Sequence, residues 1–228
     1  MVVSVCYVTL SCEKYMATRV AWQKKHCKLP NQYVLSATMD PENKVYGWVE
    51  ETGDAYESCP LKYISFFRKV DDLDDDFDWF VFIDDDTFVF HDRLVKELEQ
   101  YDKSKSLYVG NPLHHIPPMV YMAGGCGFVL SKSAFKSVKD HVRNTDAKAL
   151  QQGCRDMFCG DVCMGWWVRT VGTIESVFNR NLCYDHYDTA DGPFKRFTGQ
   201  APDVTKHATF HFLKTEEHYA HLAALNTQ

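Results

Sequence analysis

Apolar and polar residues follow one another along the chain in blocks whose length and spacing predict strands and helices in alternation. Residues 2–10 form an apolar, β-branched run, as expected for a strand covered on both faces. Residues 14–26 then have apolar side chains at helical spacing. The same order recurs in the strand-like run 79–83 and the helical run 92–101. Strands that alternate with helices predict an α/β fold with a mostly parallel central sheet.

The rest of the chain continues this order, with two segments that lack a regular pattern. Further strands are predicted at residues 32–38, 106–110, 173–178 and 208–213. Further helices are predicted at residues 60–70, 160–170 and 216–224. A glycine-rich loop, AGGCG, turns into a strand, and Ser131 or Ser133 is expected to cap a helix that runs through Val138. Residues 111–119 and 182–206 are predicted to be irregular, and irregular segments as long as the second are usually functional or disordered.

Composition and charge exclude several classes of function. The chain has 228 residues, of which 45% are hydrophobic, so a sizeable core can form. Its formal net charge is −6 and no run of Lys or Arg stands out, which argues against nucleic acid as a partner. We find no apolar run near the roughly 20 residues that span a bilayer. The opening residues lack a basic segment and a small-residue cleavage site, so they are interpreted as a strand and not as a signal peptide.

Nine cysteines are many for a chain of this length. Their number is odd and the chain is not small, so a complete disulfide framework is not expected. No CxxC pair occurs, and no histidine lies near the cluster CRDMFCGDVC, which disfavours a zinc site. We therefore predict buried free thiols in a reducing compartment.

Three consecutive aspartates, Asp84, Asp85 and Asp86, follow the apolar run 79–83 and precede further apolar residues. Unpaired carboxylates in such surroundings repel one another and are costly to bury. One interpretation is a solvated acidic turn. A phosphatase of the haloacid dehalogenase type is excluded, because its D-x-D-x-T/V pattern meets Phe88 here. A third interpretation is the D-x-D element of nucleotide-sugar transferases, in which a divalent cation neutralises the carboxylates and bridges to a diphosphate.

Four motifs together support the third interpretation. In chain order they are DWFVFIDDDTFVFHDRL, YMAGGCGFVLSKSAF, GDVCMGWWVRTVG and ATFHFLKTEEHYAHL. In that order and spacing they resemble the Fringe and core 1 β1,3-galactosyltransferase group of inverting glycosyltransferases. The resemblance covers roughly residues 78–222, with a weaker match at YVTLSCEKYMATRVAW and LKYISFFRKV.

The resemblance implies one GT-A domain over residues 1–228, with a nucleotide-binding half (1–110) and an acceptor-side half (111–228). It implies a UDP-sugar donor and Mn²⁺, with Mg²⁺ as the alternative. By position, Asp86 and His211 would be metal ligands, and Asp84 would contact the metal waters or the ribose. Carboxylate with imidazole suits manganese. Taken alone, His211 on a strand is as well explained as a core or surface histidine.

The resemblance also implies contacts to the donor and the acceptor. Expected donor contacts are Thr9, Ser11, Arg19, Lys62, Asp84, Asp85, Gly124 and Gly125. Surface salt bridges would explain Arg19 and Lys62 equally well. Cys126 stands where the family usually has alanine, so its thiol is expected to narrow the sugar pocket. Expected acceptor contacts are Trp166 and Tyr184, although helical spacing also permits Trp166 a place in the core.

Inverting transfer requires a base that takes the proton of the attacking hydroxyl. The family has an acidic pair at a helix start, and here Asp161 holds the second position while Gly160 replaces the first. Asp161 is therefore the expected base, although an aspartate at a helix start is also a common cap. The predicted function is transfer of a sugar from a UDP-sugar to a hydroxyl of a glycan or glycoconjugate. A retaining transferase, or an inactive UDP-sugar or glycan-binding module, is the alternative.

The family works in the Golgi lumen behind a membrane anchor. This sequence starts at its first strand, which favours a cytoplasmic enzyme, including the host cytoplasm if the protein is virus-encoded. A catalytic domain cut from a longer Golgi protein is the alternative.

Overall fold

The structure is a computed structural model in which most of the chain is described. The described residues are 3–37, 40, 45–47, 54–70, 76–116, 119–157, 159–184 and 204–226. The side chains of 45–47, 114–116, 119, 155, 183 and 184 lie outside this description.

Strands and helices alternate as the sequence pattern predicts. The strands are β1 Val5–Leu10, β2 Gln32–Ser36, β3 Val45–Gly47, β4 Trp79–Asp84, β5 Phe88–Val89, β6 Leu107–Gly110, β7 Pro112–Ile116, β8 Met119–Met122, β9 Phe128–Ser131, β10 Glu175–Phe178, β11 Cys183–Tyr184 and β12 Thr209–Phe210. The helices are α1 Glu13–Tyr15, a π-helix Met16–Val20, α2 Ala21–Cys27, a 3-10 helix Tyr56–Ser58, α3 Cys59–Lys69, α5 His91–Leu98, α6 Lys132–Asn144, α7 Ala147–Met157, α8 Gly160–Val171 and α9 Glu216–Leu225.

Within the described residues, seven strands form the central sheet in the order β10-β6-β9-β4-β1-β2-β3. Every neighbouring pair is parallel except the two that involve β9. The prediction of a mostly parallel sheet is therefore confirmed. Because β9 runs against β4, with Phe128 opposite Phe82, the turn before β9 lies beside the residues that follow β4.

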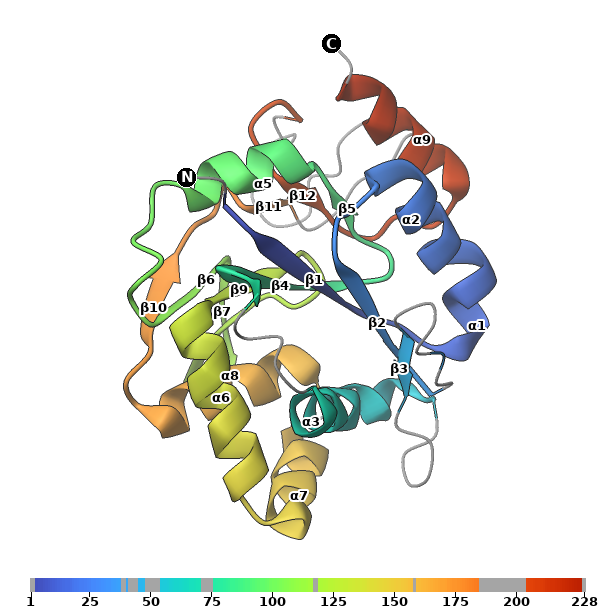
Figure 1. Ribbon diagram of the computed structural model, residues 1–228. Helices are drawn as coiled ribbons and strands as arrows, with labels where there is room; N and C mark the ends of the chain where they lie inside the picture. Colours follow the sequence, from blue (N-terminus) through green and yellow to red (C-terminus); the bar gives the residue numbers. More distant parts are fainter. Residues whose placement is uncertain are drawn as a thin grey trace.

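Helices cover both faces of the sheet (Figure 1). Helices α3, α6, α7 and α8 pack against one another below it in the view of Figure 1. Helices α2, α5 and α9 lie on the other side, together with a small sheet of β11, β12 and β5. Strand β12 is antiparallel to β5, with Phe210 opposite Phe88, and this pairing brings the residues after β12 close to the residues after β4.

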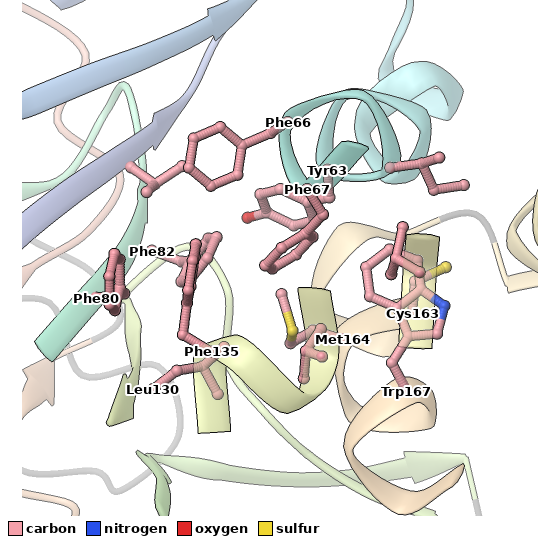
Figure 2. Packing of buried hydrophobic residues seen from close by; sticks show 14 of the residues in the cluster. Tyr63, Phe66, Phe67, Phe80, Phe82, Leu130, Phe135, Cys163, Met164 and Trp167 are labelled. Atoms are coloured by element: carbon pink, nitrogen blue, oxygen red, sulfur yellow. The ribbon is translucent and has the colours of Figure 1, made fainter. Parts of the chain in front are cut away.

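An aromatic core fixes the position of β4 (Figure 2). The rings of Phe80 on β4 and Phe135 on α6 are stacked with their centroids 3.7 Å apart, and Phe82 stacks on Phe128 at 5.1 Å. Phe67 of α3 packs between β4 and α8. A fully buried side chain of this size contributes about 1.5–3 kcal/mol to folding, so the end of β4 is rigidly held.

Most predicted elements are found, with corrections at their ends and in short segments. Ser131, not Ser133, caps α6, and its hydroxyl accepts the Ala134 N–H. Helix α6 continues past Val138, because its apolar face at Ala134, Phe135, Val138 and Val142 is buried throughout. The predicted irregular segment 111–119 instead contains β7 and begins β8, which pair with each other. Strand β12 lies within the predicted strand 208–213 but is shorter than predicted, whereas β5, β11 and α7 are too short or too polar to give a clear pattern.

Candidate donor and metal site

A cavity of about 620 Å³ lies at the carboxyl ends of β1 and β4. Its walls come from these strand ends, the 3-10 helix and start of α3, the turn before β9, the start of α8 and the segment after β12. Open α/β sheets bind their ligands at this edge, and the volume suits a small-molecule ligand. The cavity brings together Asp84, Asp86, Asp161 and His211, which are far apart in the sequence.

Asp84, Asp86 and His211 can hold a metal ion. One ligand atom of each lies within 4.8 Å of the other two. His211 Nε2 is 3.1 Å from Asp86 Oδ1 and 3.8 Å from Asp84 Oδ2. Burial raises the pKa of Asp84; His211 opposes this shift, and the charges of Asp86 and Asp85 add to it. Since two carboxylates and an imidazole are ligands that suit Mn²⁺, this donor set fits a divalent cation.

Residues 84–87, called the aspartate turn below, accept a hydrogen bond at each of their four backbone carbonyl groups. Gln23 Nε2 donates to Asp84 O at 3.0 Å and to Thr87 O at 2.7 Å. The Tyr219 hydroxyl donates to Asp85 O at 2.6 Å, and Leu213 N–H donates to Asp86 O at 3.0 Å. Gln23 is itself fully buried, and its Oε1 accepts hydrogen bonds from Thr9 and Gln32. Such partners orient metal ligands without touching the ion.

The glycine turn before β9 fits closely around the site. The ring of His211 lies where a Cβ of Gly125 would stand, and Gly125 O accepts a hydrogen bond from the Thr87 hydroxyl. A Cβ at Gly124 would be 2.8 Å from the Cβ of Asp161. Gly127 has φ +100°, a backbone conformation that residues other than glycine rarely adopt. Only glycine therefore allows this backbone to approach both functional side chains.

His211 is followed by a kink in the backbone. Phe212 has φ +66°, in the left-handed region, and its ring centroid lies 3.9 Å from that of His211. Such a conformation costs about 1–3 kcal/mol for a bulky residue and persists only where the surroundings impose it. The kink directs the Leu213 N–H to Asp86 O while the imidazole of His211 faces Asp86 Oδ1.

Asp161 lies at the start of α8 and faces the cavity. Its carboxylate accepts the Gly124 N–H at 3.0 Å and the Val162 N–H at 2.8 Å. Burial raises the pKa of Asp161, although these hydrogen bonds oppose the shift. The preceding residue, Gly160, has no room for a side chain. A Cβ there would be 2.6 Å from the Tyr63 ring, which is a steric clash.

Comparison with known proteins decides the family. The Fringe-like family model matches residues 11–183, which is more than half of the chain. The chain belongs to the Fringe-like family. The resemblance to this family is thereby confirmed, and the matched residues include the Asp84-x-Asp86 element.

One relative agrees with this assignment, and one solved structure shows the fold. Over 57 residues the chain is 39% identical to glycoprotein-N-acetylgalactosamine 3-beta-galactosyltransferase 1 of Xenopus laevis. This match covers 25% of the chain and 16% of that relative. The fold is similar to that of the glycosyltransferase GlyE of Streptococcus pneumoniae TIGR4, with a TM-score of 0.52, 12% identity, and coverage of 98% of this chain and 60% of GlyE. The Fringe-like chain thus has the GT-A fold of glycosyltransferases.

Two cations that the sequence offers for a diphosphate already have acidic partners in the Fringe-like chain. Arg19 lies 3.2 Å from Asp85 Oδ1 and 3.4 Å from Asp86 Oδ2. Lys62 is buried and donates to Asp54 and to Ser11 O, both at 2.6 Å. Exposed Lys14 also lines the cavity, and no described carboxylate lies within ion-pair distance of it.

Of the other residues predicted to contact the donor or the acceptor, some line the cavity and others do not. Ser11 lines the cavity and its hydroxyl donates to Asp85 Oδ2 at 2.7 Å. Thr9 is buried within β1, and Gln23 covers its hydroxyl, so Thr9 does not reach the cavity wall. Trp166 is half-buried against Gly153 of α7 and is not part of the described wall. The side chain of Tyr184 lies outside the described residues.

The thiol prediction is wrong for Cys126, which is buried and disulfide-bonded. It therefore has no free thiol to tune a sugar pocket. The free cysteines among the described side chains are Cys6, Cys12, Cys27, Cys59, Cys154, Cys159 and Cys163.

Sequence patterns did not identify several side chains that build the cavity or support it. Gln23 and Tyr219 occur in helices with ordinary amphipathic spacing, and nothing in that spacing marks a polar atom as buried against the aspartate turn. Tyr56 lines the cavity but belongs to no motif, and Tyr15 lies in the weakly matching stretch 7–22 without having been marked as a cavity residue. Their positions depend on the packing of distant segments.

Proposed function

We propose that the Fringe-like chain is a metal-dependent glycosyltransferase that moves a sugar from a UDP-sugar to a hydroxyl of a glycan or glycoconjugate, with inversion. One observation carries the proposal: the metal-ligand group Asp84, Asp86 and His211 shares a cavity with Asp161. A leaving diphosphate and an attacking hydroxyl need these two kinds of group close together.

Each residue has a chemical task in this proposal. Asp84, Asp86 and His211 would hold Mn²⁺ or Mg²⁺, and a bound divalent ion supplies positive charge opposite the departing diphosphate. The oxygen of the acceptor hydroxyl forms a bond to the anomeric carbon of the sugar while the bond from that carbon to UDP breaks. Asp161 takes the proton that this hydroxyl loses. The N–H of Gly124 orients the carboxylate of Asp161 for this step.

The diphosphate would also need positive side chains. Lys14 is the best candidate beside Arg19 and Lys62, because it has no described acidic partner. Arg19 can contact a phosphate while it stays paired with Asp85, since its side chain keeps 23% of its surface exposed.

The first donor to test is UDP-galactose. The named relative is a galactosyltransferase that acts on N-acetylgalactosamine of glycoproteins. The matched stretch is only 16% of that protein, so its donor and acceptor are starting points for this chain.

The disulfide at Cys126 bears on the compartment in which the enzyme works. Disulfides persist in oxidising compartments, so this bond supports a location such as the Golgi lumen over the cytoplasm. Among the described residues, no helix has both the length and the hydrophobicity to cross a bilayer.

Calorimetry tests the donor site directly. UDP is titrated into the wild type, Asp86→Ala and His211→Ala, with and without Mn²⁺. We expect Mn²⁺-dependent binding in the wild type and at least about 10-fold weaker binding in both variants. Asp140→Ala is the matched control, because Asp140 is an exposed carboxylate on α6.

The same proteins are then assayed for release of UDP from UDP-galactose and other UDP-sugars. Binding that is indifferent to Mn²⁺ and to both substitutions contradicts the proposal. UDP binding without any turnover would instead identify an inactive binding module.

A further inference from the structure

Tyr56 is unusually exposed for an aromatic side chain. Among the described residues, Tyr56 and Phe178 are the exposed large hydrophobic side chains, with 68% and 55% of their surfaces accessible. Phe178 lies on the edge strand β10, whereas Tyr56 lines the cavity. An exposed aromatic ring beside a reaction site is typical of a surface that binds a ligand.

The hydroxyl of Tyr56 is anchored next to the proposed base. Its oxygen lies 3.7 Å from Sγ of Cys159, the N-cap residue of α8, and Asp161 follows two residues later. Partial burial raises the pKa of Tyr56, and the hydrogen bond with Cys159 and the charge of Asp161 contribute to the rise. The hydroxyl is thus held at α8 while much of the side chain faces solvent.

The turn that carries Tyr56 is held by hydrogen bonds. The 3-10 helix Tyr56–Ser58 is closed by Ser58, whose N–H and hydroxyl both donate to Ala55 O, at 3.0 and 2.6 Å. Ser58 is buried, and α3 begins directly after it. A ring on a hydrogen-bonded turn that ends in the buried Ser58 loses little freedom when a ligand packs on it.

The cavity has an inner and an outer part with respect to solvent. Asp86 and His211 are buried, so a diphosphate held there occupies the inner part. An acceptor hydroxyl must reach Asp161 from solvent. Tyr56 is exposed, and its hydroxyl contacts Cys159, two residues before Asp161, so an accessible aromatic ring lies near the proposed base.

We propose that Tyr56 forms an acceptor subsite, where its ring packs against the apolar C–H face of the pyranose whose hydroxyl is attacked. The ring fixes the tilt of that sugar and so directs its hydroxyl towards Asp161. This inference rests on the proposed function. The competing occupant is the uracil ring of the donor, which would also stack on a tyrosine.

The test separates donor and acceptor steps in Tyr56→Ala and Tyr56→Phe, with Phe178→Ala as matched control. Three quantities are measured: calorimetric affinity for UDP with Mn²⁺, Mn²⁺-dependent hydrolysis of UDP-galactose, and transfer to benzyl glycosides of N-acetylgalactosamine, galactose, glucose, N-acetylglucosamine, mannose and fucose. Hydrolysis uses water as acceptor and does not need the subsite.

We expect Tyr56→Ala to raise the acceptor KM about 10-fold or more, the size of a lost aromatic contact. Its UDP affinity and hydrolysis should stay within about 2-fold of the wild type. Tyr56→Phe keeps the ring and should keep the acceptor KM within about 3-fold, as should Phe178→Ala.

Other outcomes overturn the inference. A fall in UDP affinity in Tyr56→Ala would assign the ring to the donor. An unchanged acceptor KM, or a wild type that hydrolyses UDP-galactose but uses none of the glycosides, would also contradict an acceptor subsite. A wild type that neither binds UDP with Mn²⁺ nor hydrolyses UDP-galactose would refute the proposed function itself.

Discussion

The imidazole of His211 rests against the backbone of Gly125 so closely that no Cβ fits between them. This contact joins the metal-ligand group to the glycine turn. A hydrogen bond from the Thr87 hydroxyl to Gly125 O links the same turn to the residue after Asp86. The glycine at 125 is thus required by a neighbour in space, whereas its own φ is not in the left-handed region.

Gly125→Ala should therefore displace His211. We expect Mn²⁺-dependent UDP binding to weaken by about 10-fold or more, as is usual when a metal ligand loses its support. Calorimetry with UDP and Mn²⁺ checks this. Unchanged affinity would mean that His211 is not needed where the structure has it.

Gly124→Ala is the informative partner of that variant. Its added Cβ would be 2.8 Å from the Cβ of Asp161 and meets no atom of His211 among its nearest contacts. We expect kcat for sugar transfer to fall by about 10-fold or more through misplacement of Asp161. UDP affinity should stay near that of the wild type. Equal losses of affinity in the two variants would argue against this division of labour.

Tyr219→Phe removes the hydroxyl that holds the carbonyl of Asp85. We expect about 1 kcal/mol lower stability and UDP–Mn²⁺ binding that is ~3- to 10-fold weaker, because the aspartate turn loosens. Tyr101→Phe is the control: it loses a comparable hydrogen bond, from Asn179 at 2.8 Å, outside the cavity wall. Urea unfolding should show similar losses for both, and calorimetry a loss for Tyr219→Phe alone. Equal affinities would reduce Tyr219 to a packing role.

Asp161→Asn should greatly slow transfer and spare donor binding. Loss of a general base costs about 10²- to 10⁴-fold in kcat. Burial raises the pKa of Asp161, so its basic form is lost as pH falls, at a higher pH than for an exposed aspartate near 3.9. With saturating Mn²⁺, the wild-type kcat should fall on the acidic side, and the residual activity of Asp161→Asn should lack this limb. A variant that transfers at the wild-type rate would favour a retaining mechanism.

Asp78 should contribute stability that depends on pH. Partial burial opposes ionisation, but hydrogen bonds from Lys103 at 2.8 Å and from Ser4 N–H at 3.1 Å hold the pKa of Asp78 below its usual value. A lowered pKa adds stability above the unfolded value of about 3.9, and this is lost as pH falls through the folded value.

Asp78→Asn should therefore lower the free energy of unfolding by about 1 kcal/mol at pH 7, since Lys103 is partly exposed and screened. The difference from the wild type should shrink towards pH 3 in urea titrations. The exposed Asp140→Asn is the control. A difference that stays constant with pH would show that ionisation of Asp78 is not the cause.

Local pattern was sufficient for most of the long elements. Strands β1 and β4 are continuous apolar runs, and the helical segments from Glu13 to Cys27 and in α3, α5 and α8 have apolar faces at helical spacing. The D-x-D element was recognisable because three carboxylates inside apolar surroundings require a reason. Short strands such as β5 and β11 were not predicted, because two residues carry no period.

The sequence by itself determined the α/β class, the apolar strand that precedes the three aspartates, and the family. Only the tertiary structure decided that β9 runs antiparallel beside β4, that β12 pairs with β5, and that His211 and Asp161 meet the glycine turn. It also decided that Arg19 and Lys62 have acidic partners and that Cys126 has a disulfide partner. The physical reason is that periodicity is a local property, which shows only which face of a single helix or strand is apolar. Contacts between distant segments arise from the packing of the whole core, which no spacing of residues encodes.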